Sequence, residues 1–206
     1  MTIFSKLAAA TCAFALMTGT ASAKIANGSH VSDMQVTDSN GQTHNLSDFA
    51  GKTVVLEWTN HGCPYVKKHY NTAYNDGNMQ SLQKAAAADD VVWLSVISSA
   101  PKKQGYVSGE AANDLTISRG AAPKAVILDP KGTMGRTFSA KATPHMYVID
   151  ANQTLVYQGA IDDKRGTNPL EVLSANNYVI AALASLKAGT PVVNTDTQPY
   201  GCPIKY

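Results

Sequence analysis

The residues best suited to chemistry in this 206-residue chain are Cys63 and Pro64, which follow a short loop after an apolar run. Proline is favoured in the first turn of a helix, so the pair predicts a helix with Cys63 as its N-cap residue. There, unpaired backbone N–H groups and the helix dipole favour a thiolate over a thiol. Because the thiolate is the nucleophilic form, we expect Cys63 to be the reactive centre. A buried structural cysteine is the alternative, and the polar and glycine neighbours of Cys63 argue against it.

Basic side chains surround Cys63 in the sequence. Lys67 and Lys68 lie one turn further along the predicted helix, and His61 and His69 lie on either side of them. The lysines would add positive potential at the thiolate, and the histidines would do the same if they were protonated.

A second candidate element is the dipeptide Thr143-Pro144, which opens a predicted strand. In an α/β sandwich, a proline at the start of the penultimate strand is often cis, and it then places the preceding backbone beside the helix-start cysteine. That backbone can pair with an extended substrate chain. An ordinary strand-initiating proline is the alternative, and the dipeptide alone does not decide between the two.

A further cysteine, Cys202, lies in a C-terminal tail and repeats the Gly-Cys-Pro triplet of residues 62–64. The tail contains three prolines and no hydrophobic periodicity, so we expect it to have little structure and to let Cys202 reach Cys63. The two cysteines would form either a redox couple, in which Cys63 attacks and Cys202 resolves, or a permanent disulfide. A flexible, exposed partner favours the redox couple.

Residues 1–23 are typical of a secretory signal, with a positive Lys6, an apolar stretch over residues 7–17 and small residues at the predicted cleavage site after Ala23. The apolar stretch is shorter than the roughly 20 residues that span a membrane, so no stable membrane insertion is expected. We therefore expect a periplasmic or secreted protein, in a compartment where cysteines can be oxidised.

The rest of the chain is expected to form one domain over residues 24–189, followed by the tail at residues 190–206. The formal net charge of +2 falls to +1 when the signal and its single lysine are removed. No basic stripe or run of interleaved aromatic residues is present, so nucleic acid is not an expected partner. No cofactor is expected either.

The elements that must position these residues alternate between strands and helices. Apolar β-branched runs predict strands, and helical periodicity with capping signals predicts helices. Strands are expected at 53–58, 91–97, 124–128, 145–150 and 154–158, helices at 65–74, 79–88, 108–118 and from near Pro169 to Lys187, a short helix after residue 132 that runs through Phe138, and an N-terminal β-hairpin over 34–46. This order predicts an α/β fold with a central mixed sheet flanked by helices.

The segment from Trp58 to Lys67 resembles the active centre of the thioredoxin-like superfamily. More narrowly, the chain is similar to the peroxiredoxin-like branch of the alkyl hydroperoxide reductase/thiol-specific antioxidant (redoxin) family. The other matching segments are residues 126–132, 138–144, 147–150, 155–163 and 200–206. The resemblance implies a thioredoxin-like fold with Cys63 as the active-centre cysteine and Thr143-Pro144 as its cis-proline element.

Two departures from the family patterns bear on the chemistry. A thioredoxin-type Cys-x-x-Cys motif would place a cysteine where this chain has Val66. A typical peroxiredoxin motif, Pro-x-x-x-Thr/Ser-x-x-Cys, would place a proline and a hydroxyl residue where this chain has Leu56 and Asn60. Asn60 could hydrogen-bond a peroxide oxygen instead. Arg119 and Arg136 are candidates for an arginine that stabilises the thiolate, or are surface charges.

Asp162 and Asp163 form an acidic pair after the last predicted strand. Adjacent carboxylates point to different sides of an extended chain, and Lys164 and Arg165 follow directly. We therefore expect a solvated loop with no part in the chemistry.

The leading hypothesis is an exported thiol-disulfide oxidoreductase with antioxidant, peroxiredoxin-like activity. Cys63 would attack a peroxide or a disulfide, Cys202 would resolve the product, and an external thiol reductant would reset the pair. One alternative is a copper-binding or metallochaperone protein, since two thiolates with His61, His69 or His145 would suit a soft metal. The other is a non-catalytic domain with a permanent disulfide between the two cysteines.

Overall fold

The structure is a computed structural model that describes residues 25–206. The predicted secretory signal at residues 1–23 lies outside the described residues. Between residues 25 and 206, no helix is long and apolar enough to cross a membrane.

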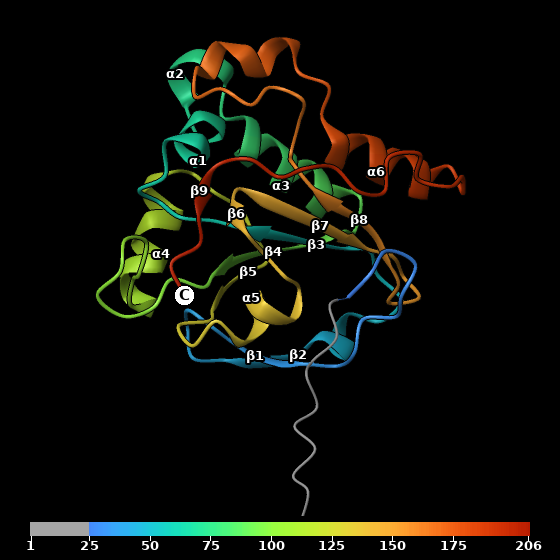
Figure 1. The fold of residues 1–206 in the computed structure, drawn as a ribbon, viewed down its shortest axis with the longest axis horizontal. Helices are drawn as coiled ribbons and strands as arrows, with labels where there is room; N and C mark the ends of the chain where they lie inside the picture. The colour runs from blue at the N-terminus through green and yellow to red at the C-terminus, as the bar shows by residue number, and fades with distance from the viewer. Residues whose placement is uncertain (1–24) are drawn as a thin grey trace, which may run out of the picture.

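A seven-stranded mixed sheet forms the centre of the molecule, in the order β2-β1-β5-β4-β3-β7-β8 (Figure 1). The strands are β1 Gln35–Asp38, β2 Thr43–Asn45, β3 Val54–Trp58, β4 Val92–Ile97, β5 Ala125–Leu128, β7 His145–Ile149 and β8 Leu155–Gly159. Strands β3, β4 and β5 are parallel, and β7 and β8 extend the sheet beyond β3 in antiparallel pairing. The β1–β2 hairpin joins the opposite edge. The predicted mixed α/β architecture is confirmed.

Helices cover both faces of this sheet. They are α1 Pro64–His69, α2 Thr72–Asn75, α3 Asn78–Ala88, α4 Gly109–Ser118, α5 Thr133–Thr137 and α6 Tyr178–Lys187, with 3₁₀ helices η1 Leu46–Phe49 and η2 Pro169–Ser174. Helices α3, α4 and α6 pack on one face and α5 on the other. The central strands are therefore buried on both sides, which explains their nearly continuous apolar sequences.

Each face of the sheet has its own hydrophobic core. On one face, Val55 and Trp93 pack against apolar side chains of α3 and α6. On the other, Trp58, Phe138 and Tyr147 form an aromatic cluster. The ring centroids of Trp58 and Tyr147 lie 4.9 Å apart, and the Phe138 centroid lies 5.4 Å from each. Because Trp58 is the last residue of β3, this aromatic cluster holds the end of the strand in place. The chain continues from there to Cys63.

The C-terminal tail has little regular structure and reaches over the domain to Cys63, as expected, but it is docked on the domain instead of flexible. Figure 1 shows it crossing back from α6 over the end of the sheet. Cys202–Pro203 forms a short strand, β9, which pairs antiparallel with β6, Ala142–Thr143. The backbone N–H of Ile204 also donates to the carbonyl oxygen of Lys141 at 3.1 Å. These bonds join residues far apart in the chain and leave no local pattern in the tail itself.

Two helices are shorter than predicted. The helix expected over 65–74 ends at His69, because the side chain of Asn71 caps the separate helix α2. The final helix begins directly after its cap Asn177, and the residues from Pro169 onward form η2 instead. In both places an asparagine side chain accepts backbone N–H groups and so starts a new helix.

The aromatic cluster predicts a large loss of stability on truncation. Phe138→Ala leaves a cavity beside Trp58 and Tyr147 and should lower the free energy of unfolding by about 3–5 kcal/mol. Denaturant unfolding measures this. In the control Ile117→Ala, the replaced side chain is 77% exposed, and the change should stay within about 0.5 kcal/mol. Similar losses in the two variants would contradict the assignment of Phe138 to the core.

Candidate active site

Cys63 lies at the start of the helix that follows β3, as the sequence predicts. It is the N-cap residue of α1, with φ −75° and ψ 125°, and Pro64 occupies the first turn. Its side chain is fully buried. The partners of its sulfur come from a distant part of the chain.

Thr143 and Pro144 face Cys63 across the end of the sheet. Their peptide bond is cis, as the family resemblance implies. Pro144 is followed by β7, whose first residue His145 pairs with Trp58 at the end of β3. The Thr143 carbonyl oxygen consequently lies 3.1 Å from Sγ of Cys63, where the thiol can donate a hydrogen bond to it.

Cys202 reaches Cys63 through the same piece of backbone. In the β6–β9 pairing Cys202 lies opposite Thr143, whose hydroxyl lies 3.4 Å from the Cys202 carbonyl oxygen. Both cysteines are free thiols, Cys63 buried and Cys202 partly buried, and each shifts the pKa of the other. The fold thus brings together Cys63, Cys202, Thr143 and Pro144, while their predicted catalytic roles stay predictions.

The two thiols differ in acidity. Burial by itself would raise the pKa of Cys63, but hydrogen bonds from the side chains of Cys202 and Thr143 help to bring this pKa below the ordinary thiol value. Burial, the hydrogen bond to Cys63 and the Cys63 charge raise the pKa of Cys202 to about 12. Cys63 therefore ionises first, and Cys202 remains a protonated donor beside it.

Asn60 is buried near the site and holds the loop that leads into α1. Its Oδ1 accepts the backbone N–H of Gly62 at 2.9 Å, and its carbonyl oxygen accepts that of Cys63 at 3.0 Å. Its Nδ2 lies 3.4 Å from the carbonyl oxygen of Gln104. Asn60 thus positions the backbone of Cys63, and its contact with a peroxide oxygen stays a prediction.

The histidines near Cys63 do not add positive charge at the thiolate, because neither is protonated near neutral pH. His69 is fully buried, and burial together with the charge of Lys68 lowers its pKa to about 3. Burial and the charges of Arg119 and Lys67 also lower the pKa of His61. Both rings are therefore neutral near neutral pH. The thiolate is stabilised more by hydrogen bonds than by charge on these histidines.

The two candidate arginines lie in different places. Arg119 donates from Nη2 to the carbonyl oxygen of His61 at 2.9 Å, and its guanidinium lies 5.0 Å from the ring centroid of Tyr70. It therefore braces the loop before α1. Arg136 instead lies 4.7 Å from the ring centroid of Tyr206, near the C-terminus. A direct effect of either arginine on the thiolate stays a prediction.

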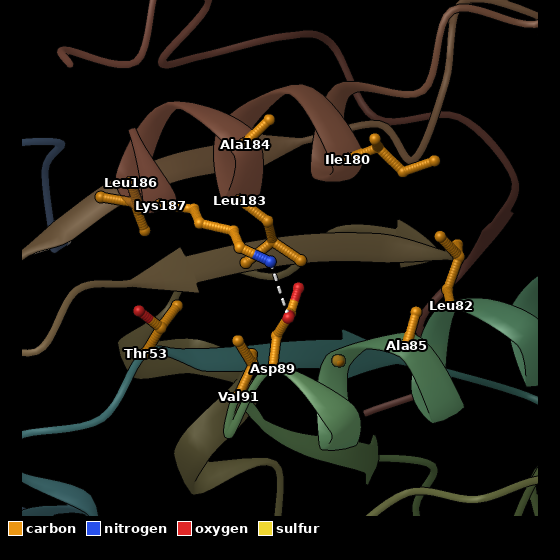
Figure 2. Close-up of a pocket in the computed structure, with 11 residues that line it drawn as sticks. Thr53, Leu82, Ala85, Asp89, Val91, Ile180, Leu183, Ala184, Leu186 and Lys187 are labelled. Carbon is orange, nitrogen blue, oxygen red and sulfur yellow. Dashed lines mark hydrogen bonds and ion pairs between the residues drawn. The ribbon is translucent and has the colours of Figure 1, made fainter. Parts of the chain in front are cut away.

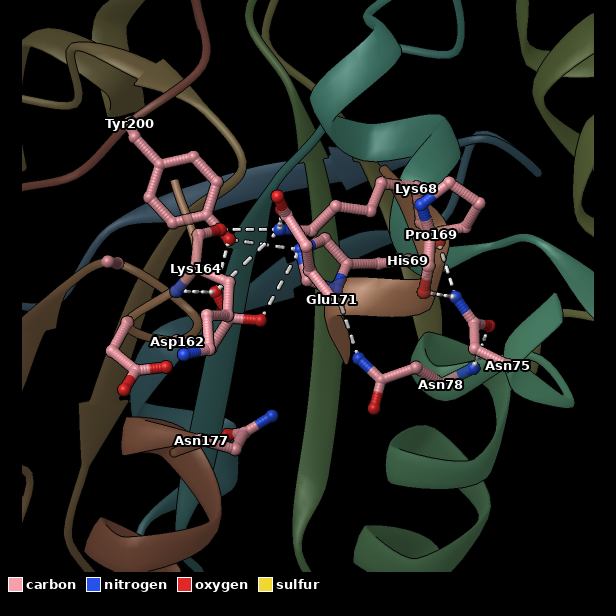
Figure 3. A network of polar contacts seen from close by, with 12 residues as sticks. Lys68, His69, Asn75, Asn78, Asp162, Lys164, Pro169, Glu171, Asn177 and Tyr200 are labelled. Atoms are coloured by element: carbon pink, nitrogen blue, oxygen red, sulfur yellow. Dashed lines mark hydrogen bonds and ion pairs between the residues drawn. The ribbon is translucent and has the colours of Figure 1, made fainter. Parts of the chain in front are cut away.

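The expectation of a solvated loop is wrong for Asp162, which is only 1% exposed. Its Oδ1 accepts hydrogen bonds from the Tyr200 hydroxyl at 2.5 Å and from the Lys164 backbone at 3.0 Å (Figure 3). Nζ of Lys68 lies 4.0 Å from the same oxygen. Its neighbour Asp163 is partly exposed. The two carboxylates do diverge as predicted, but one of them points into the protein.

A second buried carboxylate, Glu57 in β3, belongs to no motif of the sequence. It is fully buried and accepts hydrogen bonds at 2.9–3.1 Å from the side chains of Tyr70, Gln83, Trp93 and Ser95. Burial raises its pKa despite these bonds. The available signal was a charged residue inside an otherwise apolar strand, which indicates a satisfied buried polar group.

An apolar groove lies between α3 and α6, lined by Leu82, Val91 and Leu183 among others (Figure 2). An ion pair between Nζ of Lys187 and Oδ1 of Asp89, 2.7 Å apart, bridges its two sides. None of the predicted site residues lines this groove. We assign it no part in the thiol chemistry.

The copper-binding alternative lacks a ligand set in the described part of the chain. Within residues 25–206, no three His, Cys, Asp or Glu side chains are grouped so that they could hold a metal ion. His69 uses both ring nitrogens in contacts with Tyr200 and Asn78, at 3.2 and 3.0 Å.

Comparisons with known proteins agree with a thiol-redox site on this fold. The family model named Redoxin matches residues 26–178. The chain belongs to the Redoxin family. It is a thiol-dependent oxidoreductase, as the sequence predicts. No curated protein sequence matches the chain.

Solved structures with the same fold come from several bacteria. An uncharacterized conserved protein from Geobacillus kaustophilus is 23% identical with a TM-score of 0.73, covering 88% of this chain and 93% of that one. A hypothetical protein from Sinorhizobium meliloti 1021 is 19% identical with a TM-score of 0.72, covering 89% and 96%. The thioredoxin domain of a thiol-disulfide oxidoreductase from Bacteroides vulgatus is 16% identical with a TM-score of 0.50, covering 73% and 97%. These likenesses confirm the thioredoxin-like fold.

The contact between the two thiols predicts how the acidity of Cys63 responds to mutation. Cys202→Ala removes a hydrogen-bond donor from the thiolate, so the pKa of Cys63 should rise and its alkylation near neutral pH should slow. The pH dependence of iodoacetamide alkylation, followed by mass spectrometry of the Cys63 peptide, measures this. Thr37→Ala, an exposed change in β1, is the control. An unchanged or lower pKa in Cys202→Ala would contradict the thiol contact.

The buried neutral His69 predicts a loss of stability in acid. Its folded pKa of about 3 lies below the ordinary histidine value of 6.5, so the unfolded chain binds the proton first. This contribution is complete above about pH 6.5 and is lost as the pH falls toward 3, by up to about 1.4 kcal/mol per pH unit. Denaturant unfolding of wild type and His69→Gln between about pH 7 and pH 4 tests it. Equal slopes in both proteins would contradict the prediction.

Proposed function

We propose that the protein is an exported, peroxiredoxin-like thiol oxidoreductase that uses Cys63 and Cys202 as a redox couple. The observation that carries this proposal is the meeting of both thiols at Thr143, with their pKa values moved in opposite directions. Membership of the Redoxin family supports a thiol-based reaction. The signal predicted over residues 1–23 supports export to the periplasm or the medium.

In the first step, the Cys63 thiolate attacks one oxygen of a hydroperoxide. The S–O bond forms as the O–O bond breaks, sulfur is oxidised to a sulfenic acid, and the leaving oxygen takes a proton to become an alcohol or water. The Cys202 sulfur then attacks the Cys63 sulfur, and a disulfide forms with loss of water. Oxidation of Cys63 removes the negative charge that helps to raise the pKa of Cys202, so Cys202 gives up its proton more readily at this stage.

An external thiol reductant completes the cycle. Two reductant thiols supply two electrons and two protons, the reductant leaves as a disulfide, and both cysteines return to thiols. A disulfide substrate would enter the same cycle through a mixed disulfide on Cys63, which Cys202 displaces. Because Val66 stands where a thioredoxin-type motif has its second cysteine, Cys202 is the resolving thiol that the described residues offer.

The roles of the two cysteines predict different failures in their serine variants. Wild type should consume a hydroperoxide in the presence of a thiol reductant, and Cys63→Ser should fall to the background rate of the reductant alone. Cys202→Ser should still react once and should accumulate the Cys63 sulfenic acid. Peroxide consumption and mass spectrometry after trapping with dimedone measure the two steps.

Two outcomes would count against this account. Peroxide- and disulfide-reducing rates in Cys63→Ser equal to those of wild type would remove Cys63 as the nucleophile. If the wild-type protein reduces disulfides but not hydroperoxides, peroxide reduction is contradicted. Disulfide exchange at Cys63 would then be the reaction assigned to the protein.

A further inference from the structure

Both cysteines are connected to one buried group of polar side chains, shown in Figure 3. This group, the Tyr200 cluster, consists of Lys68, His69, Asp162 and Tyr200, each 5% exposed or less. Lys68 and His69 belong to α1, the helix that begins at Cys63. Tyr200 belongs to the tail and lies two residues before the second cysteine. The cluster therefore joins the two segments that carry the thiols.

Tyr200 makes the contacts that hold this cluster together. Its hydroxyl donates to Oδ1 of Asp162 at 2.5 Å, and Nε2 of His69 lies 3.2 Å from the same hydroxyl. Nζ of Lys68 lies 5.1 Å from the ring centroid of Tyr200, and the ring of Tyr65 packs edge-on with centroids 6.0 Å apart. Three side chains of α1 thus contact the same tyrosine.

The charged members of the cluster make the position of the tyrosine energetically important. Nζ of Lys68 lies 4.0 Å from Oδ1 of Asp162 and 3.8 Å from Oε2 of Glu171. Oδ2 of Asp162 has no hydrogen-bond donor among the described residues, so Asp162 depends on the donors at Oδ1. If Tyr200 left its place, one of those donors would be lost from a buried carboxyl group, which is costly.

Gly201 links Tyr200 to Cys202 and packs closely against β6. Its φ of +128° is one that side-chain-bearing residues rarely adopt, and a Cβ atom there would lie 2.0 Å from the carbonyl oxygen of Thr143. The tail and β6 are therefore in backbone contact between the tyrosine and the cysteine. On the other side of Cys202, the hydroxyl of Tyr206 donates to the carbonyl oxygen of Ala140 at 2.8 Å. Loss of Tyr200 contacts would loosen the tail without detaching it.

We propose that Tyr200 is a positioning residue: docked on Asp162, Lys68 and His69, it holds the Cys202 thiol against Cys63 and so favours formation of their disulfide. The inference rests on the proposed function only in naming Cys202 as the resolving thiol. The positioning itself is independent of which oxidant the protein meets.

The test measures the Cys63–Cys202 equilibrium with glutathione instead of with peroxide. In it, two glutathione thiols are oxidised to one disulfide as the protein disulfide is reduced to two thiols. The full chain is equilibrated with mixtures of reduced and oxidised glutathione, and its free thiols are counted by mass spectrometry. Tyr200→Phe keeps the ring and removes the hydroxyl. The equilibrium constant with glutathione gives the effective concentration of the two thiols toward each other. We expect Tyr200→Phe to lower this effective concentration about tenfold, which is the scale on which one hydrogen bond to a charged group acts.

A second readout separates positioning from general stability. Because the Cys202 side chain lowers the pKa of Cys63, a loosened tail should raise the pKa of Cys63 in Tyr200→Phe. Asp162→Asn should change both readouts in the same direction, and its matched control Asp163→Asn should change neither. Val36→Ala, a buried change in β1, should lower the free energy of unfolding and leave both readouts at the wild-type value.

If a folded Tyr200→Phe protein has the same effective concentration of the two thiols and the same Cys63 pKa as wild type, the proposal is overturned. This holds whether or not Asp162→Asn folds. Equal changes in Val36→Ala would overturn it as well, because they would assign the effect to lost stability. If the wild-type protein does not reduce peroxide but Tyr200→Phe still changes both readouts, the proposed function is contradicted. The positioning role of Tyr200 is then supported independently of it.

Discussion

The pairing of Cys202 with Thr143 is the contact on which the rest of the site depends. Strands β6 and β9 are only two residues long each, yet their pairing brings a thiol from the end of the chain to the cysteine that starts α1. Without this pairing Cys63 would keep its helix-start position but would lose a donor that lowers its pKa. The close approach at Gly201 shows how tightly the two backbones meet. A redox couple without a Cys-x-x-Cys motif needs such a contact between distant segments.

Buried carboxylates hold the helix that presents the reactive thiol. Glu57 accepts a hydrogen bond from Tyr70, the C-cap of α1, and Asp162 accepts one from Tyr200, which contacts the same helix. The C-terminal end of α1 is thus tied both to the sheet and to the tail. Its N-terminal end presents Cys63, whose ionisation is favoured by hydrogen bonds, since the neighbouring histidines are neutral. Buried polar networks of this kind stabilise one arrangement when every member has a partner.

Local features of the site could be predicted from sequence, and long-range features could not. Proline fits the first turn of a helix, so Cys63-Pro64 predicts a helix start, and continuous apolar runs predict strands buried on both faces. The docked tail was missed because its contacts join residues far apart in the chain and leave no periodic pattern. Asp162 was missed for a related reason: alternation predicts that it points away from Asp163, but only tertiary packing decides which side is buried. The end of α1 at His69 likewise depends on the capping side chain of Asn71.

The central claim is that Cys63 and Cys202 form a reversible redox couple. Its most direct test is the reduction potential of the pair in the wild-type protein, measured from thiol counts in buffers of defined potential. Structural disulfides typically have potentials below about −300 mV, and catalytic pairs are more oxidising. We predict a value above about −300 mV, with both thiols recovered on reduction. A value below it, with a disulfide that persists in excess reduced glutathione, would contradict the account and identify a permanent bond that fastens the tail.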